Sequence, residues 1–192
     1  MAARANAPRI MAFYPSHLIR RVKLADGTPI TIRPIRREDG SLAQEFVRNL
    51  SEESRFYRFM DTLRELTPRM VSHFTEIDHH SHLALIAVTQ RQEKETEIGA
   101  ARCVATDERR AGEFAIVVAD EWQRKGLGAL LMRALIDAAR AEGFTQIYGD
   151  IIASNARMLR FVTGLGFSLR QNTADPRVIR AELALDLPNR VK

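Results

Sequence analysis

The chain has 192 residues, and 45% of them are hydrophobic, which is enough for one globular domain with its own core. No apolar run approaches the roughly 18 residues that a membrane-spanning helix requires, so we expect a soluble protein. The net charge of +5, from 29 basic and 24 acidic residues, favours anionic partners but does not choose between nucleic acid, a phosphorylated cofactor and an acidic protein.

The single cysteine and the N-terminal segment bear on where the protein works. Cys103 rules out an internal disulfide and suits a reducing compartment, and its surroundings, GAARCVA, favour a buried and unreactive thiol. Residues 1–29 are rich in Arg and have no acid before Asp26, as in organellar transit peptides, but they are poor in Ser and lead directly into a strand pattern. We therefore expect a cytoplasmic protein with an N-terminal arm, residues 1–29, and one domain, residues 30–192.

Alternation and capping residues predict a strand and two helices at the start of the domain. Residues 30–35, ITIRPI, alternate and contain a proline near the end, which is typical of a strand that stops there. Asp39 fits the N-cap region of a helix with one apolar face. Thr67 followed by Pro68 starts another, because Thr caps helices well and Pro suits the first helical position.

The rest of the chain combines strands with two more helices. Three closely spaced strands predict an antiparallel meander, and an apolar pattern of i, i+3, i+4 and i+7 predicts an amphipathic helix after it. In chain order we expect strands at 82–89, 98–106 and 113–119, with a charged hairpin connection at 90–97 and a turn at 107–112, then a helix at 127–138 that Gly143 stops, a strand at 145–152, a helix capped by Ser154 and Asn155 and running through Phe161, and strands at 167–171 and 178–185. This order indicates a mixed α/β fold with a strand–helix–strand crossover.

The stretch EWQRKGLG, residues 121–128, places two glycines and two cations at the entrance of the 127–138 helix. A helix N-terminus exposes unpaired N–H groups and partial positive charge, and glycines let a ligand approach the backbone, so the stretch predicts a diphosphate-binding loop. No Lys-Ser or Lys-Thr follows, which excludes a P-loop, and the third glycine of the dinucleotide fingerprint is absent. A simple turn at a strand–helix joint explains the two glycines equally well.

The segment from Gln123 to Gly128, QRKGLG, resembles the Gln/Arg-x-x-Gly-x-Gly/Ala signature of the GNAT superfamily of N-acetyltransferases. Asn155 followed by GLGF at 164–167 is similar to the Asn…Leu-Gly-Phe ending of that superfamily, at the usual distance. The stretches YPSHLIRRVKLADGTPITIRPIRREDG and LSEESRFYRF further resemble the acetyltransferase domain of bacterial GNAT-type protein lysine acetyltransferases.

This resemblance implies a GNAT-type fold, a mixed and mostly antiparallel sheet with splayed parallel central strands flanked by helices. It also implies that acetyl-CoA lies between the strands at 113–119 and 145–152 and pairs with a strand edge, with no metal involved. The residues implied to hold acetyl-CoA are Val117 and Val118 for the pantetheine arm, Gln123, Arg124, Lys125, Gly126, Leu127, Gly128 and Ala129 for the pyrophosphate, mainly through backbone amides, and Asn155 beside the arm. For Asn155, plain helix capping is the alternative.

The resemblance further implies a general base and questions the general acid. Glu113 interrupts an apolar run and matches the subfamily's Glu-Phe-Ala position for the base, although a solvated strand-end carboxylate is the alternative. The Val118 amide would stabilise the oxyanion. The Tyr that protonates the departing thiolate in many GNAT enzymes corresponds to Val162 here, so either the thiolate leaves without an acid or the chain is inactive.

Two further clusters invite other functions. Residues 72–82 contain four histidines, but without the spaced pairs of a zinc site, so we expect a polar loop with His79, His80 and His82 in a short turn. Residues 54–59 alternate cations and aromatics and could stack single-stranded nucleic acid. We instead expect Phe56 and Phe59 to pack in the core, with Arg55 and Arg58 in solvent.

Taken together, we expect an enzyme that moves an acetyl group from acetyl-CoA to an amine, most of all a lysine side chain of a protein. The alternatives are acetylation of a small amine and a CoA-binding sensor without catalysis. The expected partner is an acceptor protein or a small amine, with no membrane partner and with nucleic acid disfavoured because no recognised motif supports the basic excess.

Overall fold

The computed structural model describes residues 13–106, 111–173 and 175–185. They form an eight-stranded sheet in the order β1-β2-β3-β4-β5-β6-β8-β7. The strands are β1 (Arg20–Lys23), β2 (Pro29–Pro34), β3 (His82–Arg91), β4 (Lys94–Ala105), β5 (Ala111–Val118), β6 (Gln146–Ile152), β7 (Ser168–Gln171) and β8 (Val178–Ala184). Neighbouring strands are antiparallel except β5 and β6, which are parallel, so the mixed sheet expected from the sequence is confirmed.

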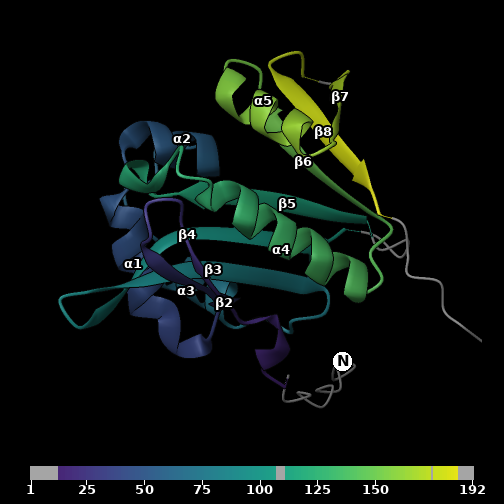
Figure 1. The fold of residues 1–192 in the computed structure, drawn as a ribbon. Coiled ribbons are helices and arrows are strands. Elements are labelled where there is room, and N and C mark those ends of the chain that lie inside the picture. The colour runs from purple at the N-terminus through teal and green to yellow at the C-terminus, as the bar shows by residue number, and fades with distance from the viewer. Residues whose placement is uncertain (1–12, 107–110, 174, 186–192) are drawn as a thin grey trace, which may run out of the picture.

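Helices cover both faces of this sheet (Figure 1). They are α1 (Gly40–Asn49), α2 (Glu52–Phe59), α3 (Pro68–Thr75), α4 (Leu127–Ala141) and α5 (Ala156–Gly164), with short 3-10 turns η1 (Ser16–Leu18), η2 (Arg37–Asp39) and η3 (Asp120–Trp122). The largest core cluster joins α4 to the strands, and two smaller clusters join α1 and α3 to the opposite face. Among the described residues no helix is long and apolar enough to span a bilayer.

Capping and periodicity set α3 and α4 where the sequence predicted helices. The Thr67 side chain accepts a hydrogen bond from the Met70 amide at the start of α3, and Pro68 is its first residue. On α4, Leu127, Leu131 and Leu135 repeat every four residues and are at most 1% exposed. This apolar stripe fixes the direction of α4 and therefore the place of its N-terminus.

The β3–β4 hairpin corrects one expectation. The charged segment 90–97 is mostly strand, because β3 continues to Arg91 and β4 begins at Lys94. Only Gln92 and Glu93 form the turn, with φ of 48° and 64°, the left-handed pair that a tight two-residue hairpin requires. Most of the turn expected at 107–112 lies outside the described residues.

Two elements, β1 and α2, and the place of β8 in the sheet were not predicted. Strand β1 pairs with β2, with Arg20 opposite Ile32. Part of the expected N-terminal arm therefore joins the edge of the sheet. The boundary of the arm at residue 29 stays a prediction. Helix α2 covers a segment that we did not assign. Strand β8 lies between β6 and β7, so the C-terminal strand pairs with β6 over its whole length, from Gln146 to Ile152.

The parallel strands β5 and β6 pair only at one end. Their register runs from Ala111 opposite Gln146 to Glu113 opposite Tyr148 and then stops. The next residues are Phe114 and Gly149, and a Cβ atom on Gly149 would lie 2.8 Å from the Phe114 ring. The buried ring therefore lies directly against the Gly149 backbone at the point where the strands part.

This contact predicts the effect of adding one methyl group. Gly149→Ala should lower the free energy of unfolding by about 1–3 kcal/mol, because the ring or the strand must move to admit the methyl group. The matched control is Gly164→Ala, where a Cβ atom meets nothing within 4 Å, and it should leave stability unchanged or raise it slightly. Urea denaturation measures both variants, and an unchanged midpoint for Gly149→Ala would contradict the tight contact.

Candidate active site

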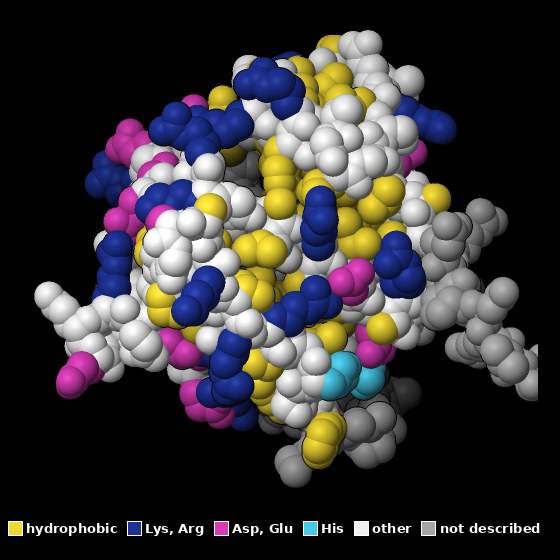
Figure 2. Space-filling model, viewed as in Figure 1, with side chains coloured by type: hydrophobic (Ala, Val, Ile, Leu, Met, Phe, Trp, Pro, Cys, Tyr) yellow, Lys and Arg dark blue, Asp and Glu magenta, His cyan; other side chains and the backbone are white. Residues whose placement is uncertain are grey.

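A cleft opens where β5 and β6 part. Beyond the last pair, β5 continues to Val118 and β6 to Ile152 without bonding to each other. The cleft between them has a volume of about 790 Å³. Figure 2 shows the surface hollowed between the regions of α2 and α5, with Lys and Arg side chains along the margins.

Five parts of the chain line this cleft. They are α2 and its C-cap (Glu53, Ser54, Tyr57, Arg58, Phe59, Met60), β5 (113–118), the start of α4 with its preceding loop (Gln123, Arg124, Gly126, Gly128, Ala129), β6 (149–152), and α5 with the residues before it (Ser154, Asn155, Ala156, Arg157, Met158, Arg160, Phe161). Segments from both halves of the sequence therefore meet at one site.

The loop before α4 leaves an uncapped helix N-terminus at one end of the cleft. Gly126 is the N-cap of α4 with φ of 84°, a conformation that favours glycine, and no side chain caps the helix. Its first backbone N–H groups consequently have no partner within the helix and carry the positive end of the helix dipole. Arg124 also lines this end. These features suit a diphosphate, and that one binds here stays a prediction.

Not every residue expected at the cradle presents its side chain there. The Leu127 side chain is 1% exposed and lies in the main core, so only its backbone is available to a ligand. The Lys125 ammonium lies 5.0 Å from the Trp122 ring centroid and 3.8 Å from Asp26 Oδ2. Its side chain is thus engaged away from the residues that line the cleft. Val117 and Val118 line the cleft from β5.

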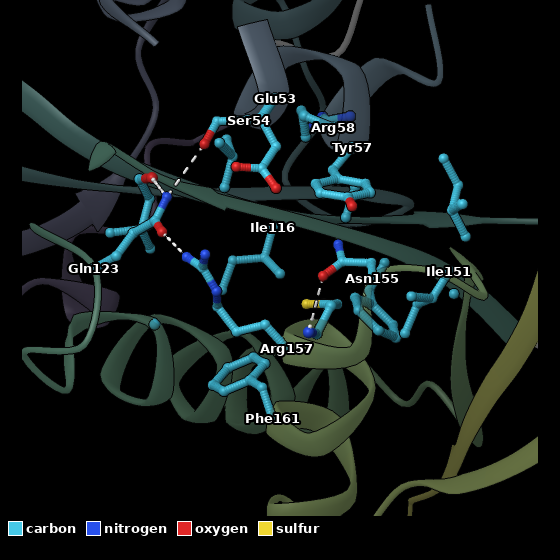
Figure 3. A pocket seen from close by; sticks show the side chains of 18 of the residues that line it. Glu53, Ser54, Tyr57, Arg58, Ile116, Gln123, Ile151, Asn155, Arg157 and Phe161 are labelled. Atoms are coloured by element: carbon cyan, nitrogen blue, oxygen red, sulfur yellow. Dashed lines mark hydrogen bonds between the residues drawn. The ribbon is translucent and has the colours of Figure 1, made fainter. Parts of the chain in front are cut away.

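Asn155 serves as a helix cap and also lines the cleft. Its Oδ1 atom accepts a hydrogen bond from the Met158 amide at 3.0 Å, which is the capping role weighed as the alternative. Figure 3 shows that, with this bond made, the side-chain nitrogen of Asn155 points toward the cleft. The two roles are compatible, because one end of the amide is used for each.

Gln123 joins the two walls of the cleft. Its Nε2 atom donates to the Val118 carbonyl at 3.1 Å and to Ser54 Oγ at 3.2 Å. The Arg157 guanidinium reaches from α5 and donates to Gln123 Oε1 (Figure 3). Arg157 was missed from the sequence, because a single Arg in an amphipathic helix carries no local signal of what it contacts.

Glu113 lies at the closed end of the cleft, beside the last β5–β6 pair, and its side chain is exposed. Arg58 lines the same cleft from α2 and lies 5.0 Å from the Phe59 ring centroid. Burial lowers the pKa of Arg58 to about 10, while attraction to Glu113 opposes that shift, so the guanidinium stays charged at neutral pH.

These positions correct the expected packing of residues 54–59. Arg58 is half-buried in the cleft instead of lying in solvent, and Phe56 is 44% exposed instead of buried. Phe59 does pack against the smaller core cluster on this face. Glu53 and Tyr57 also line the cleft, but they were not predicted as site residues. Their spacing acquires meaning only once the segment is known to be a helix.

Two further residues that the sequence analysis discussed, Val162 and Cys103, do not line the cleft. Val162 is fully buried in the main core. Cys103 is also fully buried, as expected, and burial raises the pKa of its thiol to about 12, which makes it unreactive at neutral pH.

The histidines of residues 72–82 make ordinary structural contacts. His82 was expected both in the short turn and as the first residue of the strand after it; it begins β3 and is buried, and its Nε2 atom lies 3.0 Å from Arg102 Nη1. Burial, helped by the Arg102 and His73 charges, lowers the pKa of His82 to about 4. His80 pairs with Glu142 at 2.9 Å. Within the described ranges no three His, Cys, Asp or Glu side chains are grouped to hold a metal ion.

Two comparisons with known proteins point to the same family. Residues 45–167 match the model of the acetyltransferase (GNAT) family. Acetyltransferase PA5475 from Pseudomonas aeruginosa is 35% identical over 162 residues, which is 84% of this chain and 87% of that protein.

Solved structures share the fold. The GNAT domain of PAT from S. lividans superposes with a TM-score of 0.82, at 24% identity over 90% of this chain and 100% of that one. YncA from Salmonella typhimurium, described as a putative acetyltransferase and solved with its cofactor acetyl-CoA, gives a TM-score of 0.64 at 20% identity over 85% of this chain and 98% of that one. From the matched residues, the shared sequence and the splayed sheet, we conclude that the chain belongs to the GNAT family of acetyltransferases.

Proposed function

We propose that this acetyltransferase moves an acetyl group from acetyl-CoA to the side-chain amine of a protein lysine. The observation that carries the proposal is that one cleft holds both an anion cradle, at the N-terminus of α4, and a carboxylate, Glu113, at the point where β5 and β6 part. The cradle suits the diphosphate of the donor, and the carboxylate suits the amine of the acceptor.

The described residues suit the donor along the length of the cleft. Backbone amides at residues 126–129 would hold the diphosphate, because they have no partner within the helix and no side chain caps them. The β5 segment around Val117 and Val118 has no strand on its β6 side and would pair with the amide groups of the pantetheine arm. Asn155 would donate to the same arm from the opposite wall.

Glu113 would prepare the acceptor for attack. A lysine ammonium with a pKa of about 10.4 must lose its proton, which costs about 4.6 kcal/mol at pH 7. Glu113 would accept that proton, directly or through water. The amine nitrogen then forms a bond to the thioester carbon, the backbone amide of Val118 stabilises the oxyanion, and the carbon–sulfur bond breaks to release the thiolate. With Val162 buried, we propose that the thiolate leaves without a protein acid.

The lining of the cleft favours a cation on a flexible stem. Glu53 on α2 and Glu113 on β5 both line the cleft, and their charges attract an ammonium group. Tyr57 and Phe59 also line the cleft and provide apolar surface for the methylene groups of a lysine. The likeness of the fold to the PAT domain agrees with a protein acceptor, and the buried cysteine agrees with work in the cytoplasm.

The cradle can be tested by placing a carboxylate in it. Gly126→Asp should weaken acetyl-CoA binding at least tenfold, or about 1.4 kcal/mol, because a negative charge and a Cβ atom enter the anion site. Gly27→Asp is the matched control, because Gly27 has nearly the same φ, 82°, and also has nothing within 4 Å of a built Cβ. Calorimetry measures both. Equal affinity in the two variants would place the diphosphate elsewhere.

The base can be tested by removing one carboxylate at a time. Glu113→Gln should lower turnover by about 10²-fold or more and leave the affinity for acetyl-CoA unchanged, because the proton acceptor is lost while the cradle is intact. Glu53→Gln keeps Glu113 and should retain most of the turnover. Thiol release under saturating acetyl-CoA reports the rates. If only Glu53→Gln reduced turnover, Glu53 would replace Glu113 as the base.

The acceptor class can be tested with blocked lysines. Labelled acetyl-CoA should modify an extract of cellular proteins, and prior reductive dimethylation of their lysines should abolish the labelling, because dimethyl-lysine keeps its charge but cannot form an amide. Mass spectrometry locates the modified residues. Faster turnover with free lysine or a polyamine than with any protein would favour a small-molecule acceptor. Tight acetyl-CoA binding without turnover on either class would favour a sensor.

A further inference from the structure

A second cavity lies on the α1 side of the sheet, between α1, the base of the β3–β4 hairpin and η3. We call it the α1 cavity. Its volume is about 250 Å³, and it shares no lining residue with the cleft. Leu42 and Phe46 on α1 and Ala119 before η3 form apolar walls. The acetyl-transfer chemistry gives this cavity no role.

Four carboxylates also line the α1 cavity, and three of them have partners. Glu45 pairs with Lys94 at 2.8 Å, and Glu121 pairs with Arg91 at 2.8 Å. Asp120 accepts hydrogen bonds from the Ser51 amide and hydroxyl and from the Ser54 hydroxyl, at 2.7 to 2.9 Å. These three charges are satisfied by the protein itself.

Glu97, the fourth carboxylate, differs from the others. A β-bulge opposite Ala87 and Val88 interrupts the alternation of β4, so Glu97 is only 5% exposed and the following Ile98 only 1%. Glu97 Oε2 is buried and has no hydrogen-bond partner within the described part of the chain. A carboxylate that is buried without a partner destabilises the fold unless it is protonated or paired with a cation.

The nearby cations attract Glu97 but do not hydrogen bond to it. Arg33 makes hydrogen bonds to both Asp39 oxygens, at 2.7 and 2.8 Å, and to Glu95 at 2.7 Å, and its buried Nε atom has no partner among the described residues. Arg102 is bonded to His82 at 3.0 Å. The charged groups that face Glu97 or line the cavity with it are Arg33 on β2, Asp39 on η2, Glu45 on α1, Arg91 on β3, Arg102 on β4, and Asp120 and Glu121 on η3.

We propose that the α1 cavity binds a short alkylammonium ion, with the ammonium group against Glu97 and the alkyl chain along the apolar walls. The cavity combines an unsatisfied acid with an apolar lining, and this combination selects an organic cation over a metal ion or a neutral molecule. The site is separate from the acceptor end of the cleft and does not depend on the proposed acetyl transfer.

The test is a two-dimensional NMR titration of the full chain with n-butylammonium chloride at pH 8, and with n-butanol as the uncharged counterpart. Saturable shifts should appear at amides of α1 and of residues 96–98, and n-butanol should bind at least tenfold more weakly. Glu97→Gln should weaken binding at least tenfold. Glu65→Gln, which removes an exposed carboxylate of the same charge, and Glu113→Gln should leave it unchanged.

The pH dependence adds an independent readout. Burial raises the pKa of Glu97 to about 8, opposed by the Arg102 and Arg33 charges, so an ammonium ion must displace a proton at neutral pH. Affinity should therefore rise about tenfold from pH 6 to pH 7 and level off above pH 8. Asn49→Trp, at an exposed position that lines the cavity, should block binding even if Glu97→Gln fails to fold. Shifts confined to the cleft, or equal affinity in Glu97→Gln, would overturn the proposal.

Discussion

The parting of two parallel strands is the constraint on which the rest of this molecule depends. Pairing between β5 and β6 ends at Glu113 and Tyr148, and the Phe114 ring then lies against the Gly149 backbone. Everything that distinguishes the site follows from this separation, because it creates the cleft and frees one edge of β5. It also brings the N-termini of α4 and α5 to the two sides of one cavity.

Much of this architecture could be predicted from sequence where local rules act. The Thr67 cap, the apolar stripe of α4 and the glycines before that helix each carry their own signal. The site could be predicted in part because the anion cradle is built from consecutive residues. Arg58 and Arg157 could not be found in this way, because their significance arises from contacts between segments far apart in the chain. Helix α2 was missed because four of its eight residues are charged and none is fully buried, so its apolar residues are few.

Charge is distributed differently at the cleft and at the α1 cavity. At the cleft, Arg58 and Glu113 are close enough to attract each other, and both face a space large enough for substrate. At the α1 cavity, Arg33 and Arg102 hydrogen bond to neighbouring groups other than Glu97, and Glu97 Oε2 has no hydrogen-bond partner among the described residues. Burying a charged group is unfavourable without a partner, so such an imbalance in a folded core points to a ligand or to a resident proton.

The position of β8 has a consequence for biosynthesis. The wall of the cleft formed by β6 is completed only when residues 178–184 pair with it, and these residues follow all the other described strands in the chain. A ribosome-bound chain can form the β2–β5 meander early, since those strands are close in sequence. It cannot complete this wall of the cleft until residues 178–184 have been translated, so the cleft forms after the meander.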